Sequence, residues 1–524
     1  MSGKALIAVA MAVGLLGLAA CGGGGGGGGG GGSSSSGATS ITVTLSASSG
    51  SASVTEGATA ASLATTATAT GPVPTSAVAD LQYDKTVFST VTATAGAGGS
   101  YAVSLQTLPN LAGGEYKGTV NFRLCQDTSC ANVYAGSAVS YTYDIIVSLQ
   151  DWTTFQRDAG HRGYVHTSYD STKFTKLWAW TDPAGNPSGA INAAVTGGNA
   201  VYVTSSTGKV YKIDEQSGTS VWSYDASANM NSIGSAAYDN GTIYVPTFDF
   251  TSSNGLGNEY GVIWGIDAST GLYKNDYSFA AQWSSWLSPT LYKSVMYFSA
   301  GYYGGQVYAY STTKGTQTWL TSGGGGNAWD RETPAVDDKY VYYYDGTHLE
   351  VYNVADGSAV EMISDPNATA YTYSYGGAPI VGSSGDVLAL SGTQEQIRKI
   401  TRFNIATGTV AWGTANGYKT TPAIAGGVIY AARNSPGIVD AINEADGTVA
   451  WSWPMPAGNS TFTGNLVVTD NLLFVCTDKN VYAIDLTTHQ SVWSYAATGA
   501  LTISANNILY IASNPGTLTA IKLK

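Results

Sequence analysis

Short apolar segments recur through residues 151–524 and are separated by polar turns. In one typical stretch, residues 472–477 form an apolar run, residues 481–486 alternate between apolar and polar positions, and residues 491–495 contain one tryptophan. Alternation with a period of two, bounded by turns, indicates short β-strands. Because a few such strands cannot bury both faces of their sheet, each unit is expected to stack against copies of itself.

Eight paired strands follow this pattern, at residues 191–203, 235–245, 287–298, 332–344, 377–390, 420–431, 464–476 and 500–512. Most are followed by a strand ending in Asp or Asn, a glycine four residues later and a tryptophan four residues beyond it, as in Asp214, Gly218 and Trp222. The Asp or Asn caps a tight turn, the glycine supplies positive φ, and the indole fills the space between neighbouring sheets. The predicted inter-blade tryptophans are Trp178, Trp222, Trp319, Trp412, Trp451 and Trp493.

The two ends of the repeat region are incomplete in complementary ways. Residues 509–524 end before their tryptophan, while residues 177–180 stand near the start with no strands before them. A blade assembled from both ends would close the ring and pair the edges that an open array would expose. The predicted fold is therefore all-β, with an eight-bladed β-propeller over residues 151–524 that is closed by both ends of this region.

The beginning of the chain is organised as an export signal, with Lys4, a short apolar stretch and small residues before Cys21. The apolar stretch is too short to span a membrane. Residues 18–21 resemble the bacterial lipobox, which implies removal of residues 1–20 and acylation of Cys21; an ordinary secretory signal with an incidental cysteine is the alternative. Since Gly22 is not the aspartate associated with inner-membrane retention, the resemblance implies lipid anchoring in the outer membrane, on its periplasmic face or at the cell surface.

Residues 21–37 begin with Cys21 and otherwise consist of glycine and serine, and they are expected to form a flexible tether. Residues 38–150 then show the alternating strands of a small β-sandwich. The stretch 113–120, with the cysteines and residues 141–143 that follow it, resembles immunoglobulin-like (Ig-like) modules of bacterial surface proteins. In an exported protein, Cys125 and Cys130 are expected to form a disulfide, and a metal site is the alternative.

Composition and charge narrow the class of partner. The chain has 524 residues, a formal net charge of −12 and a pI of about 4.7. A surface that follows nucleic-acid phosphates needs clustered Lys and Arg, so nucleic acid is not an expected partner. The length requires at least two globular units, which the sandwich and the propeller supply, and a monomer is expected.

Residues 151–163 and the repeats after them resemble β-propellers of the pyrroloquinoline-quinone (PQQ) repeat family. Together with the lipobox, they resemble the BamB-like lipoproteins of that family, which implies an envelope location and a role in outer-membrane β-barrel assembly. The same family includes dehydrogenases. Arg157, Asp158, His161 and Arg162 are expected to clasp this junction against the propeller, and a binding role is the alternative.

The loops that enter the innermost strands are expected to crowd around one mouth of the central channel. They contain aromatic and charged residues that suit a protein- or sugar-binding rim: Trp283, Trp286, Trp329, Asp330, Arg331, Glu332, Tyr375, Tyr418, Lys419 and Phe462. For any single ring, packing of loop against loop is the alternative. Arg331 can bind a partner carboxylate unless it pairs with Asp330 or Glu332.

The residues argue against an enzyme. The dehydrogenases of the resembled family carry adjacent cysteines, a calcium-binding set of acids and amides, and a catalytic aspartate, whereas this propeller contains only Cys476, in an apolar strand. The four histidines of the chain lack metal-ligand spacing. We therefore expect no catalytic residue, no metal, and neither PQQ nor calcium as a cofactor.

The sequence thus predicts a non-catalytic, lipid-anchored envelope protein whose propeller is a protein-binding scaffold in outer-membrane assembly. The expected partner is another envelope protein or a surface ligand, with the membrane reached through the lipid anchor. A surface glycan-binding or adhesin-like protein, which would use Trp283, Trp286 and Trp329, is the first alternative, and a PQQ-dependent dehydrogenase is the second.

Overall fold

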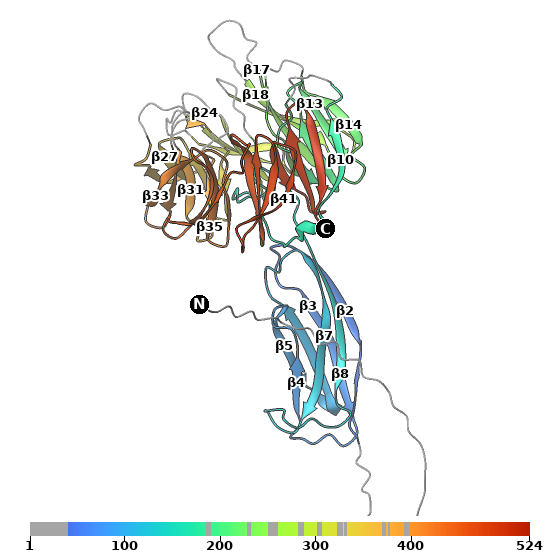
Figure 1. Ribbon diagram of the computed structural model, residues 1–524. Helices are drawn as coiled ribbons and strands as arrows, with labels where there is room; N and C mark the ends of the chain where they lie inside the picture. Colours follow the sequence, from blue (N-terminus) through green and yellow to red (C-terminus); the bar gives the residue numbers. More distant parts are fainter. Residues whose placement is uncertain are drawn as a thin grey trace, which may run out of the picture.

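The computed structural model describes residues 40–184, 190–227, 232–249, 260–280, 288–300, 306–321, 328–329, 333–368, 374–375, 378–391 and 398–524. They form an elongated β-body, residues 40–149, and a ring that rests on one end of it (Figure 1). Apart from two single turns of 3-10 helix, all regular structure described is β-strand, which confirms the all-β fold class. The predicted signal, lipobox and acylated Cys21 lie outside the described residues. Within them, no helix has the length and apolarity needed to cross a membrane.

The elongated body consists of two four-stranded sheets that share one hydrophobic core. The first has the order β1 (Thr42–Leu45), β3 (Ser62–Thr70), β6 (Ser100–Thr107), β5 (Phe88–Ala95). The second has the order β2 (Ser49–Thr55), β8 (Val139–Ser148), β7 (Gly114–Cys125), β4 (Val78–Gln82). Buried and exposed residues alternate along β3 and β8, as expected for strands with one face on a core. The Ig-like assignment stays a prediction.

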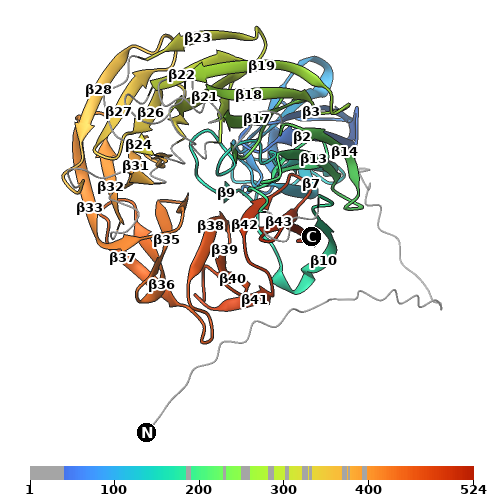
Figure 2. The ribbon, with the colours of Figure 1, turned by 90° about the horizontal axis from the view of Figure 1, so that it is seen from above.

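In the described part of the ring, seven sheets of four or five strands follow one another along the chain, and we number them 1 to 7 (Figure 2). Sheet 1 consists of β11 (Val195–Gly197), β12 (Ala200–Thr204), β13 (Lys209–Asp214) and β14 (Ser220–Asp225). Sheet 2 consists of β15 (Ser232–Ile233) and β16 (Ala237–Asp239), which both pair with β17 (Thr242–Asp249), followed by β18 (Tyr260–Asp267) and β19 (Tyr273–Ala280). Sheet 3 consists of β20 (Thr290–Tyr292), β21 (Val295–Ala300), β22 (Gln306–Ser311) and β23 (Thr316–Leu320). Sheets 4 and 5 are β25 (Ala335–Val336), β26 (Tyr340–Tyr344), β27 (His348–Asn353), β28 (Ala359–Ser364); and β30 (Ile380–Val381), β31 (Val387–Ser391), β32 (Arg398–Asn404), β33 (Thr409–Tyr418). Sheets 6 and 7 are β34 (Ala423–Ala425), β35 (Val428–Asn434), β36 (Gly437–Asn443), β37 (Val449–Pro454); and β38 (Phe462–Thr469), β39 (Leu472–Thr477), β40 (Val481–Asp485), β41 (Ser491–Tyr495).

A further sheet closes the ring and combines both ends of the propeller region. Its order is β10 (Thr175–Thr181), β44 (Thr517–Lys522), β43 (Ile508–Ser513), β42 (Ala500–Ile503). Trp178 lies opposite Ala520, and Trp180 lies opposite Leu518. The predicted closure by both ends is therefore confirmed, since β10 pairs with the edge of β44 that would otherwise be open.

The junction segment, residues 151–163, runs through the middle of the ring and is bonded to sheets 1 to 7. Six of these sheets donate a backbone N–H to it at 2.7–2.9 Å, from Thr196, Tyr238, Val336, Val381, Ile424 and Val468 to the carbonyl oxygens of Trp152, Thr153, Ala159, Gly160, Arg162 and Gly163, respectively. Sheet 3 is reached through Thr154, whose hydroxyl donates to the Pro289 carbonyl oxygen at 2.7 Å. Strand β9 (Tyr164–Val165) then pairs in parallel with β38. The clasp predicted for this segment is thus confirmed.

His161 is fully buried within this clasp. Its Nδ1 and Nε2 atoms lie 2.8 Å from the Pro379 carbonyl oxygen and from the Thr290 hydroxyl, which belong to different sheets. Burial lowers the pKa of His161 to about 4, although the hydrogen bond to Pro379 acts in the opposite direction. The imidazole is therefore neutral at physiological pH and serves as a hydrogen-bonding spacer.

The free energy of unfolding is expected to fall as the pH drops from about 6.5 to about 4, by roughly 3 kcal/mol from His161 alone. The sign follows because a base with a depressed pKa in the folded state binds its proton more readily when unfolded. Denaturant titrations at pH 7 and pH 4.5 should show a smaller difference for His161→Gln than for the wild type. A difference between pH 7 and pH 4.5 that is as large in His161→Gln as in the wild type would contradict the assignment.

A buried ion pair joins the elongated body to the ring. Arg157 donates to both carboxylate oxygens of Glu56, with Nη1 at 3.1 Å from Oε1, and also to the carbonyl oxygens of Tyr164 and Gln150. The two side chains are only 6% and 9% exposed. Backbone N–H groups of His166 and Gln150 donate to the same carboxylate. The chain terminus lies at this junction (Figure 1), where Lys524 donates to the Thr167 hydroxyl at 2.9 Å.

Candidate functional site

The ring encloses a cavity of about 710 Å³ above the junction segment. Trp152, Thr154, Phe155 and Gln156 form its floor. Its walls come from residues at or before the innermost strands of several sheets: Asn192, Ala194, Ser235, Ser288, Thr333, Thr421, Gly464, Asn465, Thr498 and Leu501. The volume is typical of small-molecule sites.

The described walls of this cavity carry hydroxyl and amide groups and almost no charge. Asp478 is the one ionisable residue among the described lining residues. Hydrogen bonds from the hydroxyl and the backbone N–H of Ser460 lower the pKa of Asp478 to about 2. A carboxylate with such a pKa does not exchange protons near neutral pH. The described walls therefore suit recognition by hydrogen bonds and not general acid–base catalysis.

The amide side chains of the cavity also hold neighbouring sheets together. Asn465 Nδ2 donates to Gln156 Oε1 at 2.6 Å and to the Leu501 carbonyl oxygen at 3.1 Å, which ties sheet 7 to the floor and to the closing sheet. Asn192 Nδ2 donates to the Ile233 carbonyl oxygen at 3.0 Å and ties sheet 1 to sheet 2. Neither residue was predicted from the sequence, although each stands just before or within an innermost strand. Their bonds make the walls a preformed surface.

The structure describes only some of the residues that were predicted to form the binding rim. Trp283, Trp286, Asp330, Arg331 and Glu332 lie outside the described residues. The backbones of Trp329 and Tyr375 lie opposite each other in a short parallel pair, β24 (Ala328–Trp329) with β29 (Ser374–Tyr375). Lys419 is exposed and lies two residues before Thr421 of the cavity wall.

Tyr418 and Phe462 are core residues and do not belong to an exposed rim. They are 3% and 2% exposed. Tyr418 is the last residue of β33, and its hydroxyl donates to the buried Asp440 carboxylate at 3.0 Å. Phe462 begins β38 and packs in one cluster with Trp453. The prediction of loop positions was wrong for these two residues because the flanking strands extend further than their sequence pattern indicates.

Four of the inter-blade indoles make the same contact with the next sheet. Their Nε1 atoms donate at 2.9–3.1 Å to the carbonyl oxygens one residue after the turn Asp or Asn, from Trp178, Trp222, Trp319 and Trp412 to Glu215, Ala268, Val354 and Glu444. Each ring also covers the turn glycine of the next sheet, and these glycines are Gly218, Gly271, Gly357 and Gly447. A Cβ atom on any of them would lie 2.4–2.8 Å from an atom of the indole ring. These glycines hold positive φ and leave room for the indole.

The other two predicted tryptophans pack against different partners. Trp451 stacks on His489, with 4.3 Å between ring centroids, and His489 takes the place of the turn glycine at φ 58°. Trp493 contacts Phe174 edge-on at 5.3 Å. At two interfaces another residue takes the register position of the indole. Glu361 approaches Gly408 between sheets 4 and 5, whereas Asn275 of sheet 2 lies against Gly265 of its own sheet.

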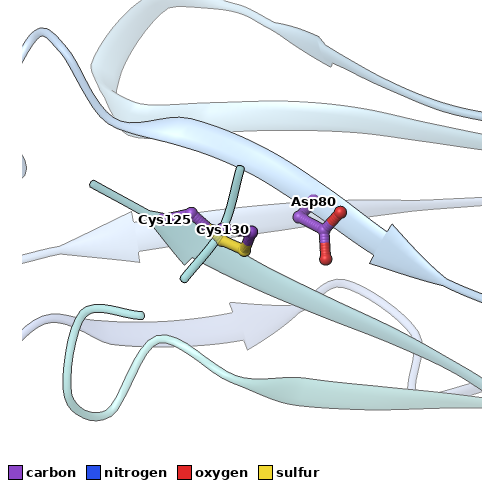
Figure 3. A group of neighbouring side chains, drawn as sticks. All are labelled: Asp80, Cys125 and Cys130. Carbon is purple, nitrogen blue, oxygen red and sulfur yellow. A yellow bond between two sulfur atoms is a disulfide. The ribbon is translucent and has the colours of Figure 1, made fainter. Parts of the chain in front are cut away.

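Cys125 and Cys130 are joined by a disulfide at the end of β7, beside Asp80 of β4 (Figure 3). Asp80 is held by Arg123, whose Nε donates to Oδ2 at 2.7 Å. Sulfur atoms joined in a disulfide are not thiolate ligands, and the carboxylate already has a cationic partner. Cys476 is buried in β39, and burial raises the pKa of its thiol to about 12, so it is not a nucleophile at neutral pH.

A match to a known family model covers most of the ring. The family model described as outer membrane protein assembly factor BamB matches residues 161–453, more than half of the chain. The chain belongs to the BamB family. No curated protein matches it in sequence.

Solved structures resemble this BamB-family chain at low sequence identity. BamB from Moraxella catarrhalis aligns with a TM-score of 0.52 and 16% identity over 67% of this chain and 99% of that one. A quinohemoprotein alcohol dehydrogenase from Comamonas testosteroni gives 0.53 and 15% over 71% and 80%, and a europium-containing methanol dehydrogenase gives 0.51 and 13% over 71% and 98%. An assembly factor and two dehydrogenases thus share this fold, and the fold by itself does not distinguish between these functions.

The described cavity of this BamB-family chain does not fit pyrroloquinoline quinone. That cofactor is a polycarboxylate, so its site needs cationic side chains or a divalent cation held by several acidic ligands. The described lining residues include no Lys, Arg or His and a single carboxylate, Asp478.

Proposed function

We propose that this BamB-family protein is a non-catalytic, lipid-anchored scaffold of the cell envelope, whose ring binds another envelope protein at the open mouth of the cavity. The observation that carries the proposal is the wall chemistry: the described hydroxyl and amide groups are neutral, and several of them are already bonded between sheets. Such walls provide shape and hydrogen bonds without a proton donor or a redox group.

The position of the elongated body supports the choice of face. It rests against the side of the ring where Glu56 meets Arg157, and the junction segment closes the cavity from that side. The opposite mouth, near Thr421 and Lys419, is left for a partner. With the lipid anchor and tether preceding the elongated body, this arrangement would hold the mouth away from the membrane.

Site-specific crosslinking in the native envelope tests the scaffold. A photoreactive residue at Lys419 or at Arg331 is expected to capture one discrete protein, while the same residue at Lys85, in the elongated body, should not capture it. Equal capture from all three positions, or none from the first two, would contradict a mouth-specific partner. Stoichiometric binding of PQQ with calcium, together with reduction of an electron acceptor by an alcohol or aldose, would replace the scaffold by a dehydrogenase.

A surface glycan-binding protein is the second candidate, because hydroxyl- and amide-lined walls also suit neutral sugars. Glycan-array binding that is lost when Asn192 or Thr333 is changed would favour it. A silent array alongside a discrete crosslinked protein would decide for the scaffold.

A further inference from the structure

The interface between sheets 2 and 3 lacks the indole that fills most of the others. Asn275 of β19 lies opposite Gly265, the register position that Trp222 occupies opposite Lys212 in sheet 1. Its Oδ1 atom lies 1.8 Å from where a Cβ on Gly265 would be, so the side chain lies flat against its own sheet. At Gly315, the turn glycine of sheet 3, no described atom lies within 4 Å of the corresponding Cβ position.

The space left by the missing indole is a pocket of about 400 Å³ between sheets 2 and 3. These sheets are neighbours in the ring (Figure 2): β16 contacts β20, and the ring centroids of Phe279 in β19 and Phe298 in β21 lie 4.8 Å apart. The pocket is lined by Asp239, Asn240, Lys274, Thr313, Lys314 and Gly315, and by the buried Tyr244. Both lysines are exposed, so the pocket opens to solvent. It is separate from the central cavity, with which it shares no lining residue.

The charges of this pocket favour an anion. Neither Lys274 nor Lys314 has an ion-pair partner among the described residues; Lys274 Nζ donates to the Thr242 hydroxyl at 2.8 Å and keeps further N–H groups. Asp239 accepts from the Thr312 hydroxyl at 2.6 Å and from Asn240 Nδ2 at 3.0 Å. Two lysines against one carboxylate make the lining locally positive in a chain of net charge −12.

The remaining groups suit hydroxyls. The Asp239 carboxylate has acceptor capacity beyond the two bonds it receives, Asn240 has an amide oxygen, and Thr313 is an exposed hydroxyl. We propose that this pocket binds an acidic saccharide, with its carboxylate at Lys274 and Lys314 and its hydroxyls toward Asp239, Asn240 and Thr313. The site does not depend on the scaffold role proposed for the mouth of the central cavity.

Titration calorimetry of the folded chain with D-glucuronate and D-galacturonate tests the proposal. At least one of them is expected to bind at least ten times more tightly than D-glucose and than inorganic phosphate. Lys274→Gln or Lys314→Gln should weaken binding at least tenfold, because each removes one of the two ammonium groups. Lys339→Gln, an exposed lysine outside the pocket, is the matched control and should bind as the wild type does.

The Asn275→Trp substitution restores the missing indole and provides an independent test of the proposed site. The new ring is expected to cover Gly315, donate to the Thr312 carbonyl oxygen, raise the melting temperature and abolish sugar binding. Uronate binding that survives in this variant, equal affinity for phosphate, or no uronate binding by the wild type would each overturn the assignment. If Asn275→Trp fails to fold, the Lys274→Gln and Lys314→Gln affinities decide alone.

Discussion

Replacing Trp319 by alanine is expected to lower the free energy of unfolding by about 3 to 5 kcal/mol, the range for emptying a large buried aromatic site. Among the six inter-blade tryptophans it is the buried one, 8% exposed. Its Nε1 donates to the Val354 carbonyl oxygen at 3.1 Å, and its ring lies over Gly357 and near Tyr297. Alanine would leave a cavity between sheets 3 and 4 and an unpaired carbonyl oxygen.

Denaturant unfolding of Trp319→Ala and Trp493→Ala side by side measures this effect. Trp493 is half-buried and meets Phe174 at one edge, so its removal should cost clearly less than that of Trp319. Trp319→Phe, which keeps an aromatic ring without the N–H, should fall between the wild type and Trp319→Ala. Equal stabilities for Trp319→Ala and the wild type would show that the indole does not contribute to the packing between sheets 3 and 4.

Arg157→Ala is expected to destabilise the protein by about 3 to 5 kcal/mol, because it leaves the Glu56 carboxylate buried without its cation. The loss should appear first as separation of the elongated body from the ring, since the pair joins these two bodies. Limited proteolysis near residue 150 and small-angle scattering would report that separation. Arg157→Ala with Glu56→Gln should recover part of the stability, whereas additive losses would show that the two side chains do not act as a pair.

The same pair predicts acid sensitivity at the junction. Burial by itself raises the pKa of Glu56, but the hydrogen bonds and charge of Arg157 and the N–H groups of His166 and Gln150 outweigh it, and the pKa lies below its ordinary value. The stabilisation is therefore present above about pH 4.5 and is lost as the pH falls through the lowered value. Glu56→Gln should remove this dependence and leave that of His161 in place.

The repeats, the closing sheet and the register of the inter-sheet tryptophans could be predicted from the sequence. Each depends on residues close together in the chain: Asp214, Gly218 and Trp222 stand four residues apart because turn and strand geometry requires that spacing. The closure of Trp178 with Ala520 was predictable since one end of the repeat region lacked what the other supplied.

Positions next to the irregular loops could not be predicted in the same way. Tyr418 and Phe462 were assigned to a rim because they follow or precede loops, but strand pairing carries both into the core. The local pattern indicates which positions of a strand are apolar, but it does not indicate how far the neighbouring strand continues to pair with it.

The sequence by itself determined that the chain forms a ring of repeated sheets, the positions of the inter-blade tryptophans and the closure by both ends of the propeller region. These features could be predicted because periodicity and turn chemistry are encoded in residues close together in the chain. Only the tertiary structure decided that residues 151–163 bond to one sheet after another, that Glu56 pairs with Arg157 across 101 positions, and that Asn275 leaves a pocket over Gly315. These features depend on the distance between atoms far apart in the chain, which neither composition nor spacing records.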